Sequence, residues 1–303
     1  MRIAVLPDCD EHLKQAIKAT GAKKVDLNRA EALLWTISSQ AGFPEELPDS
    51  IRWVQLKSAG VRPWLISKTI DDQRDWSSAA GAYSEDVAEH AVGMLIALMR
   101  NFPYYAHAKT WTKEATWGYV SSLRKQRIAI IGCGSIGRAM IAPLTAFGAE
   151  ILAVNRSGRP VEGAAKTVTS EHLDSVLEDA DHAIIAGAST PETNHMIALR
   201  QLELLGPQGN LVNIARGDLI DSSALEHALT NEIINGAALD VTEPEPLPDG
   251  HPFWHLDNVL ITPHVANPQQ NMGSSFARFV KKNIERVQQG MPPLGLIDTA
   301  RSY

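Results

Sequence analysis

The chain has 303 residues, a formal net charge of −7 at pH 7 and 44% hydrophobic residues. This length exceeds what one hydrophobic core usually organises, so we expect two domains. The negative balance disfavours nucleic acid or an anionic membrane surface as the main partner, because neither attracts an acidic protein over long range. The chain opens on a short strand rather than a signal peptide, and no apolar run of about 18 residues occurs in it.

Cysteine usage is low and does not indicate a metal centre. Cys9 and Cys133 are too few for a disulfide framework and lack the spacing of metal ligands. We therefore expect a reducing, cytoplasmic compartment and no bound metal. Cys133 is interpreted as a small filler rather than a nucleophile, because no base stands beside it in the sequence.

Over residues 1–80, short apolar runs alternate with polar and amphipathic segments. We expect strands at 3–6, 32–37 and 53–56 and a helix at 10–20. This alternation is typical of a small parallel α/β domain. The run Ser58-Ala59-Gly60 follows the last of these strands, where a turn can aim backbone N–H groups at a carboxylate. An ordinary turn is the alternative interpretation.

Residues 84–100 form the longest apolar segment of the first half. Ser84 and the two acids after it are typical of a helix start, and the remainder is apolar nearly all round, which predicts a buried helix between the domains. Glu89 and His90 lie on this helix and are expected to be structural hydrogen-bonding residues rather than catalysts. The arm that follows, residues 101–127, is aromatic and has no clear period, which favours packing on a neighbouring subunit.

The most informative stretch is 128–157, which reads as a strand, a glycine turn, a helix and a second strand. In such a turn Gly132 allows the tight bend, Gly134 lets the backbone approach a pyrophosphate, and Gly137 lets the helix pack closely. The N–H groups at the helix start, around Ser135-Ile136, then face the phosphates. The pattern predicts a dinucleotide-binding βαβ unit. An ordinary strand–turn–helix is the alternative.

The end of the second strand bears on which dinucleotide binds. NAD sites usually carry a carboxylate there for the ribose 2′-hydroxyl, and the run from Val154 to Arg159 has none. A 2′-phosphate would instead meet Arg156 and the short polar groups of Asn155 and Ser157. We therefore expect NADP(H) as the preferred cofactor. NAD(H) is possible if Arg156 and Arg159 are only solvated loop charges.

Strands and helices continue to alternate after this unit. We expect helices at 170–178, 198–204 and 222–229, strands at 182–186, 210–213, 236–240 and 259–262, and a last amphipathic helix at 268–289. These elements complete a doubly wound parallel sheet.

Three of these strands are followed by ionisable residues, namely Arg216, Glu245 and His264. All three lie where a doubly wound sheet binds ligands. Hydride transfer between a nicotinamide and a 2-oxo acid needs a cation for the carboxylate, a proton donor for the carbonyl oxygen, and a group that keeps this donor protonated. A guanidinium, an imidazole and a carboxylate have these properties. Glu243 is as close in sequence as Glu245 and is a second candidate for the carboxylate.

With these residues in view, the chain resembles the D-isomer-specific 2-hydroxyacid dehydrogenases. The similarity spans nearly the whole chain and rests on Ser58-Ala59-Gly60, Asp86-Val87-Ala88-Glu89, the turn 132–137, Thr190-Pro191-Glu192-Thr193, 213–217, Leu239-Asp240-Val241 with Glu245-Pro246, and Thr262-Pro263-His264. The resemblance implies NAD(P)-dependent reduction of a small 2-oxo acid, of the glyoxylate or hydroxypyruvate class, to a D-2-hydroxy acid. It implies two doubly wound parallel-sheet α/β domains, with a Rossmann cofactor domain (91–269) inserted into a smaller flavodoxin-like substrate domain (1–90 and 270–303).

The resemblance also implies roles for the residues at the strand ends. His264 is the expected acid–base residue, Glu245 orients and charges it, and Arg216 binds the substrate. The family's glutamate directly precedes a proline and stands five places after the strand's aspartate. Asp240 plus five is Glu245, which favours Glu245 over Glu243.

Further implied contacts concern the substrate carboxylate and the nicotinamide. The amides around Ala59 and Gly60 are expected on the carboxylate, and Ser84, Ala215 and Asp240 near the nicotinamide. Two departures from the family pattern leave roles open: Arg62 either alters substrate preference or faces solvent, and Asn267 could line the pocket.

The expected partners are a small 2-oxo or 2-hydroxy acid and a second copy of the chain. The implied homodimer would form through the cofactor domain and the arm 101–127. The alternative function is a nucleotide-sensing interaction protein on the same scaffold, similar to the corepressors related to these dehydrogenases.

Overall fold

The structure is a computed structural model that describes residues 1–298. Contacts within it divide the chain into two units, one formed by Met1–Ser84 with the segment from Pro268 on, the other by Glu85–Asn267. The sequence predicts crossings between domains after residues 90 and 269. The structure has them after Ser84 and Asn267, so nearly all of the long helix at this junction belongs with the second unit.

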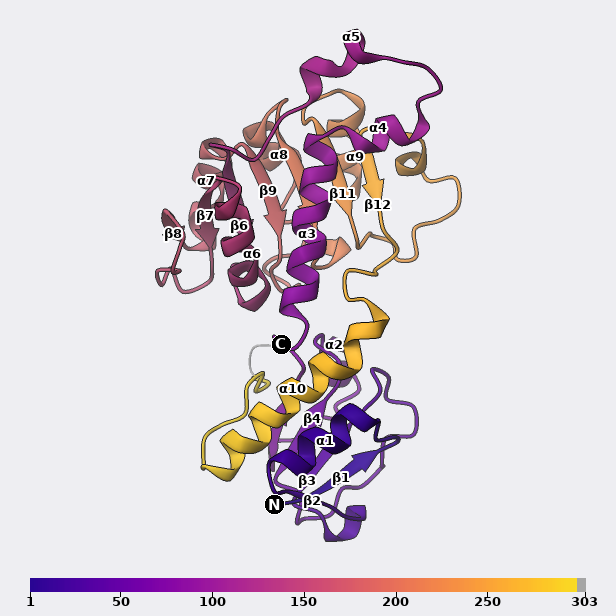
Figure 1. The fold of residues 1–303 in the computed structure, drawn as a ribbon, viewed down its shortest axis with the longest axis vertical. Coiled ribbons are helices and arrows are strands. Elements are labelled where there is room, and N and C mark those ends of the chain that lie inside the picture. The colour runs from indigo at the N-terminus through magenta and orange to yellow at the C-terminus, as the bar shows by residue number, and fades with distance from the viewer. Residues whose placement is uncertain (299–303) are drawn as a thin grey trace. The chain divides into compact units, whose positions relative to one another are not determined.

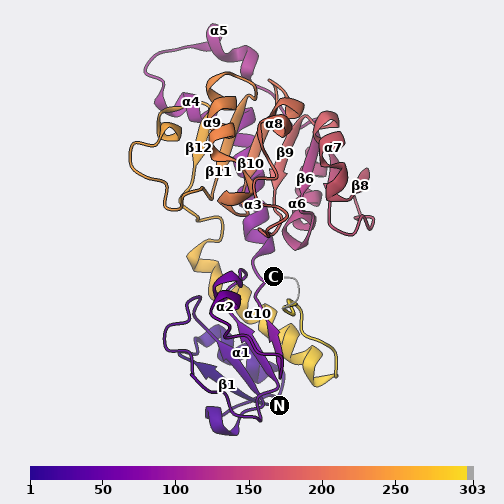
Figure 2. The same cartoon turned by 180° about the vertical axis from the view of Figure 1, so that it is seen from behind.

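The first unit contains a parallel sheet whose strands follow the flavodoxin-like order β2-β1-β3-β4-β5. Its strands are β1 (Arg2–Leu6), β2 (Lys23–Lys24), β3 (Ala32–Trp35), β4 (Trp53–Leu56) and β5 (Asp75–Ser77). Its helices are α1 (Glu11–Ala19), α2 (Arg62–Ile66) and α10 (Gln269–Gln288). Helices α1 and α10 lie side by side in front of the sheet in Figure 1, and α2 lies on the opposite face in Figure 2.

A buried polar network attaches the C-terminal tail to this sheet. Gln55 of β4 is fully buried, and its Oε1 accepts hydrogen bonds from Asn283 Nδ2 (2.7 Å) and Ser77 Oγ (2.8 Å). Asn283 also accepts the Leu294 amide at 2.7 Å. Together with an antiparallel bridge between Ser77 and Leu296, these bonds hold the tail beside β5.

The second unit contains a larger parallel sheet in the order β12-β11-β10-β9-β6-β7-β8. Its strands are β6 (Arg127–Ile131), β7 (Glu150–Val154), β8 (Lys166–Val168), β9 (His182–Ile185), β10 (Asn210–Asn213), β11 (Gly236–Leu239) and β12 (Val259–Ile261). The order reverses at β6, which makes this a Rossmann sheet with its switch point between β6 and β9. The prediction of two doubly wound parallel-sheet domains is confirmed.

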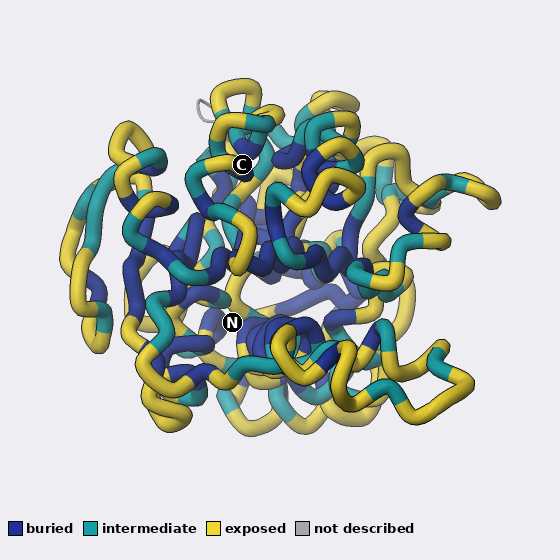
Figure 3. The backbone as a smooth tube through the Cα atoms, turned by 90° about the horizontal axis from the view of Figure 1, so that it is seen from above, coloured by how far each residue is buried: buried dark blue, intermediate teal, exposed yellow. Residues whose placement is uncertain are grey.

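Helices cover both faces of this sheet. They are α3 (Ser84–Met99), α6 (Ser135–Ala146), α7 (Leu173–Asp179), α8 (Leu199–Leu205) and α9 (Ser222–Thr230). Helix α3 lies in front of the sheet in Figure 1, whereas α8 and α9 lie in front of it in the reverse view of Figure 2. Strands β9, β10 and β11 are buried along their whole length, because a sheet covered on both faces has no solvent side. Figure 3 shows stretches of buried backbone in the middle of the view and exposed backbone around its edge.

The arm 101–127 carries short helices, α4 (Phe102–His107) and α5 (Lys113–Thr116), and a 3-10 turn at 117–119. Several of its aromatic side chains are exposed, with Trp111 at 89% and Trp117 at 68%. The Lys113 ammonium lies 4.7 Å from the centre of the Trp117 ring.

Over the described range 1–298, no helix combines the length and the apolar character needed to cross a bilayer.

Candidate active site

The glycine turn links β6 to α6 at the switch point of the larger sheet. Gly132 has a φ of +86°, and a Cβ there would lie 2.1 Å from the Cα of Gly187 after β9, so only glycine fits. A Cβ at Gly137 would lie 3.0 Å from the Ile130 side chain, which shows how closely α6 approaches β6. Gly132 is therefore required by the fold, whereas a side chain at Gly137 would press against Ile130 and Cys133.

Gly134 has a different environment. The nearest atom to a Cβ at this position would be the Gly132 carbonyl oxygen at 3.9 Å, so the backbone of Gly134 faces open space. Gly134 is also the N-cap of α6 and has no side chain with which to cap the helix. The N–H groups at Ser135-Ile136 and in the rest of the first turn are thus left for an external acceptor. These features fit the pyrophosphate of a dinucleotide.

The loop after β7 is closed by its own side chains. Asn155 Oδ1 accepts hydrogen bonds from the Ser157 amide (3.0 Å) and hydroxyl (3.1 Å), and Asn155 Nδ2 donates to the Arg159 carbonyl (2.9 Å). The polar groups of Asn155 and Ser157 therefore shape the loop. Arg156 and Arg159 are exposed on it, and residues 155–159 include no carboxylate that would repel a phosphate.

An imidazole and a carboxylate meet at the ends of two adjacent strands. β11 and β12 pair in register, with Leu239 opposite Ile261, and Glu245 and His264 follow them. His264 Nδ1 lies 2.6 Å from Glu245 Oε1. Both side chains are about half exposed, at 49% for His264 and 42% for Glu245. Because the carboxylate engages Nδ1, Nε2 is the ring atom left to exchange a proton with a ligand.

Arg216 lies on a turn after β10, the next strand in the sheet. Asn213 shapes this turn by accepting the Ala215 amide (3.0 Å) and donating to the Arg216 carbonyl (2.8 Å). A Cβ on Gly217 would lie 2.0 Å from the Thr242 carbonyl oxygen, so the turn packs directly against the loop that carries Glu245. The turn that carries the exposed Arg216 thus packs, at Thr242 and Glu243, against the loop on which Glu245 stands.

These residues lie within a segment that known proteins share. Residues 92–266 match the model of the D-isomer specific 2-hydroxyacid dehydrogenase family, NAD binding domain. The chain belongs to this family. Glyoxylate/hydroxypyruvate reductase HPR3 of Arabidopsis thaliana is 33% identical over 72% of this chain and 67% of its own length. An uncharacterised protein of Corynebacterium melassecola is 33% identical over the full length of both chains.

Solved structures agree with this assignment. A D-isomer specific 2-hydroxyacid dehydrogenase from Xanthobacter autotrophicus Py2, in complex with NADPH and MES, superposes with a TM-score of 0.81. The identity is 25%, and the superposition covers 100% of this chain and 99% of the other. The protein is thus an NAD(P)-dependent oxidoreductase of 2-oxo and 2-hydroxy acids, and the predicted family and reaction are confirmed. The alternative of a corepressor-like protein receives no support.

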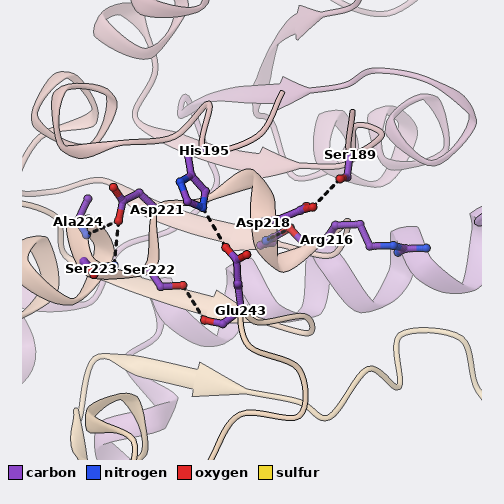
Figure 4. Close-up of polar contacts among 10 residues, drawn as sticks. Ser189, His195, Arg216, Asp218, Asp221, Ser222, Ser223, Ala224 and Glu243 are labelled. Carbon is purple, nitrogen blue, oxygen red and sulfur yellow. Dashed lines mark hydrogen bonds and ion pairs between the residues drawn. The ribbon is translucent and has the colours of Figure 1, made fainter. Parts of the chain in front are cut away.

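The loop of this dehydrogenase that carries Glu245 holds a second histidine–glutamate pair, shown in Figure 4. His195 Nε2 lies 3.0 Å from Glu243 Oε2, and Ser222 Oγ donates to the Glu243 carbonyl at 2.9 Å. The Arg216 side chain runs away from this pair in the same view. Glu243 and Glu245, which sequence proximity cannot separate, thus contact different histidines. His195 was not singled out by the sequence, because it stands 48 residues from its partner.

Asp240, expected near the nicotinamide, is 2% exposed at the end of β11. Its Oδ1 accepts from Thr262 Oγ1 (2.6 Å) and the Val265 amide (2.9 Å), and its Oδ2 from the Ala266 amide (3.1 Å). Burial raises the pKa of this carboxyl, but hydrogen bonds from His90, Thr262 and the two amides outweigh burial and lower the pKa. Asp240 is therefore ionised, with both oxygens used by the turn that carries His264.

The residues expected on the substrate carboxylate belong to the first unit. Ser58 follows β4, and its carbonyl accepts the Ala79 amide at 2.9 Å. Tyr83 donates from its hydroxyl to the Lys57 carbonyl at 3.0 Å, and burial raises the pKa of this hydroxyl. Ala59 and Gly60 are exposed. In the described part of the chain, the buried hydroxyls of Ser58 and Ser84 have no hydrogen-bond partner.

The two positions that depart from the family pattern differ in their surroundings. Arg62 is exposed at the first position of α2. Asn267 is partly buried where the chain passes from one unit to the other, and its Oδ1 makes no hydrogen bond within residues 1–298.

Over the same range, no group of three or more His, Cys, Asp or Glu side chains could hold a metal ion.

Proposed function

We propose that this dehydrogenase reduces a small 2-oxo acid, of the glyoxylate or hydroxypyruvate class, to the D-2-hydroxy acid with NADPH as the preferred reductant. The observation that carries the proposal is the 2.6 Å contact between His264 and Glu245, whose loop packs against the turn of Arg216. The name of the Arabidopsis relative, a glyoxylate/hydroxypyruvate reductase, supports the substrate class.

In this proposal His264 is the general acid. Its Nε2 donates a proton to the carbonyl oxygen of the substrate as negative charge develops there. Glu245, at Nδ1, orients the ring and favours the imidazolium that holds this proton. Arg216 presents a guanidinium that can bind the substrate carboxylate through two parallel hydrogen bonds and stabilise charge on the carbonyl oxygen. The bound nicotinamide supplies the hydride.

We assign cofactor binding to the domain predicted at residues 91–269, nearly all of which lies in the second unit, Glu85–Asn267. The pyrophosphate would lie on the open backbone of Gly134 and on the N–H groups of Ser135-Ile136, with Gly132 and Gly137 shaping the turn. Ser84, Ala215 and Asp240 would lie near the nicotinamide. For Asp240 this role adds to the contacts that it already makes with the turn of His264.

The preference for NADPH rests on the loop after β7. Arg156 and Arg159 are exposed there, and Asn155 and Ser157 keep the loop closed. A ribose 2′-phosphate would gain charge-assisted hydrogen bonds from the arginines, and no carboxylate opposes it. The Xanthobacter relative, whose structure contains NADPH, supports this choice.

We assign substrate binding to residues 1–90 and 270–303. The amides around Ser58, Ala59 and Gly60 would receive the substrate carboxylate, because this turn follows the carboxyl end of β4. The unpartnered Ser58 hydroxyl in the described structure supports a polar ligand at this turn. Residues 299–303 of the assigned domain lie outside the described part of the chain.

We further propose a cytoplasmic homodimer formed through the cofactor domain and the arm 101–127. Trp111 and Trp117 on this arm are exposed at 89% and 68% in the single chain. Burial of two such indoles against a second copy would remove a large apolar area from water.

The direct test is a panel of 2-oxo acids assayed with NADPH and NADH in parallel. Glyoxylate and hydroxypyruvate should be reduced with a higher kcat/KM than a bulky 2-oxo acid such as phenylpyruvate. Each should be reduced better with NADPH. Turnover of phenylpyruvate alone would contradict the substrate class, and faster turnover with NADH would contradict the cofactor preference.

A further inference from the structure

The turn that carries His264 adopts a backbone conformation that needs support from neighbouring residues. His264 has a φ of +55°, in the left-handed region that residues with a Cβ rarely occupy. Its amide donates to the carbonyls of Asp240 (2.8 Å) and Thr262 (3.0 Å). The amides of the next two residues, Val265 and Ala266, donate to the carboxylate of the same Asp240. The turn is therefore wrapped around one buried aspartate.

The aspartate is in turn connected to helix α3 through a chain of hydrogen bonds. Thr262 has one hydroxyl hydrogen, and it donates this hydrogen to Asp240 Oδ1 at 2.6 Å. His90 Nε2 lies 3.0 Å from the same hydroxyl oxygen, so Nε2 must be the donor in that contact. His90 Nε2 also lies 3.4 Å from Asp240 Oδ1. One N–H group from α3 thus supports both residues that hold the turn.

We propose that His90 is a positioning residue for His264 and acts through Thr262 and Asp240. A carboxylate that is 2% exposed is costly to bury unless donors surround it, and His90 supplies one donor from outside the turn. Without this donor the Thr262 hydroxyl loses its fixed orientation, and the left-handed turn loses part of its support. His264 then meets Glu245 less often in the geometry that proton transfer needs.

The same geometry predicts that His90 does not affect the pyrophosphate site. The glycine turn follows β6, which is separated from β11 by β10 and β9 in the sheet. Loss of the His90 donor should therefore disturb the chemical step and leave the pyrophosphate site intact. Glu89, the exposed neighbour of His90 on α3, provides a matched control on the same helix turn.

The inference rests on the proposed acid role of His264, and the experiment separates the two. Steady-state kcat and KM for glyoxylate, and the Kd of NADPH from fluorescence, are measured for H90L, H90Q and E89Q. H90L should lower kcat by about tenfold and change the KM and the Kd by less than about twofold. H90Q places an amide N–H near the position of Nε2 and should recover most of kcat. E89Q should match the wild type.

A double-variant cycle tests whether His90 acts through the histidine–glutamate pair. In the E245Q background, H90L should lower kcat by less than about twofold further, because the contact that His90 positions is already lost. The inference is overturned if H90L alone keeps the wild-type kcat, if H90Q loses as much as H90L, or if the losses of H90L and E245Q multiply in full.

A readout that does not depend on turnover keeps the inference testable if no 2-oxo acid is reduced. The imidazole NMR signals of His264, assigned with H264Q, should shift in H90L and return towards the wild-type position in H90Q. Unchanged signals in H90L would overturn the positioning role. Absent reduction by a wild type whose His264 signals respond to H90L would instead overturn the proposed function alone.

Discussion

The Nδ1 atom of His264 lies 2.6 Å from Oε1 of Glu245, across the ends of two paired parallel strands. The same loop places Glu243 3.0 Å from His195. The dehydrogenase therefore contains a second histidine–glutamate pair that serves as a control for the proposed catalytic pair. Both pairs join a histidine to a glutamate and have similar exposure, but only the first contains a residue that follows β12, namely His264.

The first prediction compares the two glutamates. E245Q should lower kcat by about 10- to 100-fold, because the neutral amide no longer favours the imidazolium form of His264. E243Q should stay within about twofold of the wild type, because Glu243 contacts His195 and not His264. Steady-state assays with glyoxylate and NADPH measure both. Equal losses in the two variants would contradict the assignment of Glu245.

The second prediction concerns the cofactor. R156A should raise the KM for NADPH by about tenfold, because a charge-assisted hydrogen bond to the 2′-phosphate is lost. The KM for NADH should be unchanged, since NADH has no such phosphate. NADH thus serves as the control within the same variant. A similar rise for both cofactors would mean that Arg156 supports the loop and does not read the phosphate.

The third prediction is a pH dependence of stability caused by His182. Burial lowers the pKa of His182 from 6.5 to about 4, and its Nδ1 accepts the Asn210 amide at 3.1 Å. Below pH 6.5 the unfolded chain takes up the proton first, so the free energy of unfolding falls as the pH drops from 6.5 towards 4. This group should remove about 2 kcal/mol between pH 7 and pH 5.

Urea unfolding of wild type and H182N at these two pH values measures the effect. Asparagine keeps an acceptor for the Asn210 amide but does not titrate. H182N should therefore lose about 2 kcal/mol less than the wild type between the two pH values. Identical losses would show that His182 does not protonate on unfolding in this range.

The fourth prediction concerns the arm. Light scattering coupled to size exclusion should give a dimer mass for the wild type and a monomer mass for W111S/W117S at micromolar concentration. The reason is that two indoles exposed in the single chain would be buried in the dimer. I66S changes an apolar residue that is 74% exposed in the first unit and should remain a dimer. A monomeric wild type would refute the proposal.

Most of the fold could be predicted because the buried strands are recognisable in the sequence as short apolar runs. β3, β4 and β9 to β11 are short apolar runs that are buried from end to end, and turn residues or amphipathic helices separate them. β2 (Lys23–Lys24) and β8 (Lys166–Val168) could not be predicted, because these short edge strands carry lysines and expose polar side chains. Their pairing depends on the neighbouring strand rather than on their own sequence.

The site shows a similar division. The glycine turn is formed by residues close together in the chain. The spacing of Gly132, Gly134 and Gly137 is therefore enough to predict it. The contact between His90 and Thr262 joins residues that stand 172 positions apart, and no periodicity relates them. Only the pairing of β11 with β12 and the packing of α3 on the sheet bring such residues together. The family resemblance therefore names Glu245 as the partner of His264, but nothing in the sequence pairs His90 with Thr262.

The most direct test of the central claim is the single-turnover reduction of glyoxylate by NADPH in H264Q, followed by the loss of NADPH absorbance. If His264 is the proton donor, the rate of hydride transfer should fall by about a thousandfold, while the NADPH Kd stays within about twofold of the wild type. A hydride-transfer rate in H264Q close to that of the wild type would contradict the account.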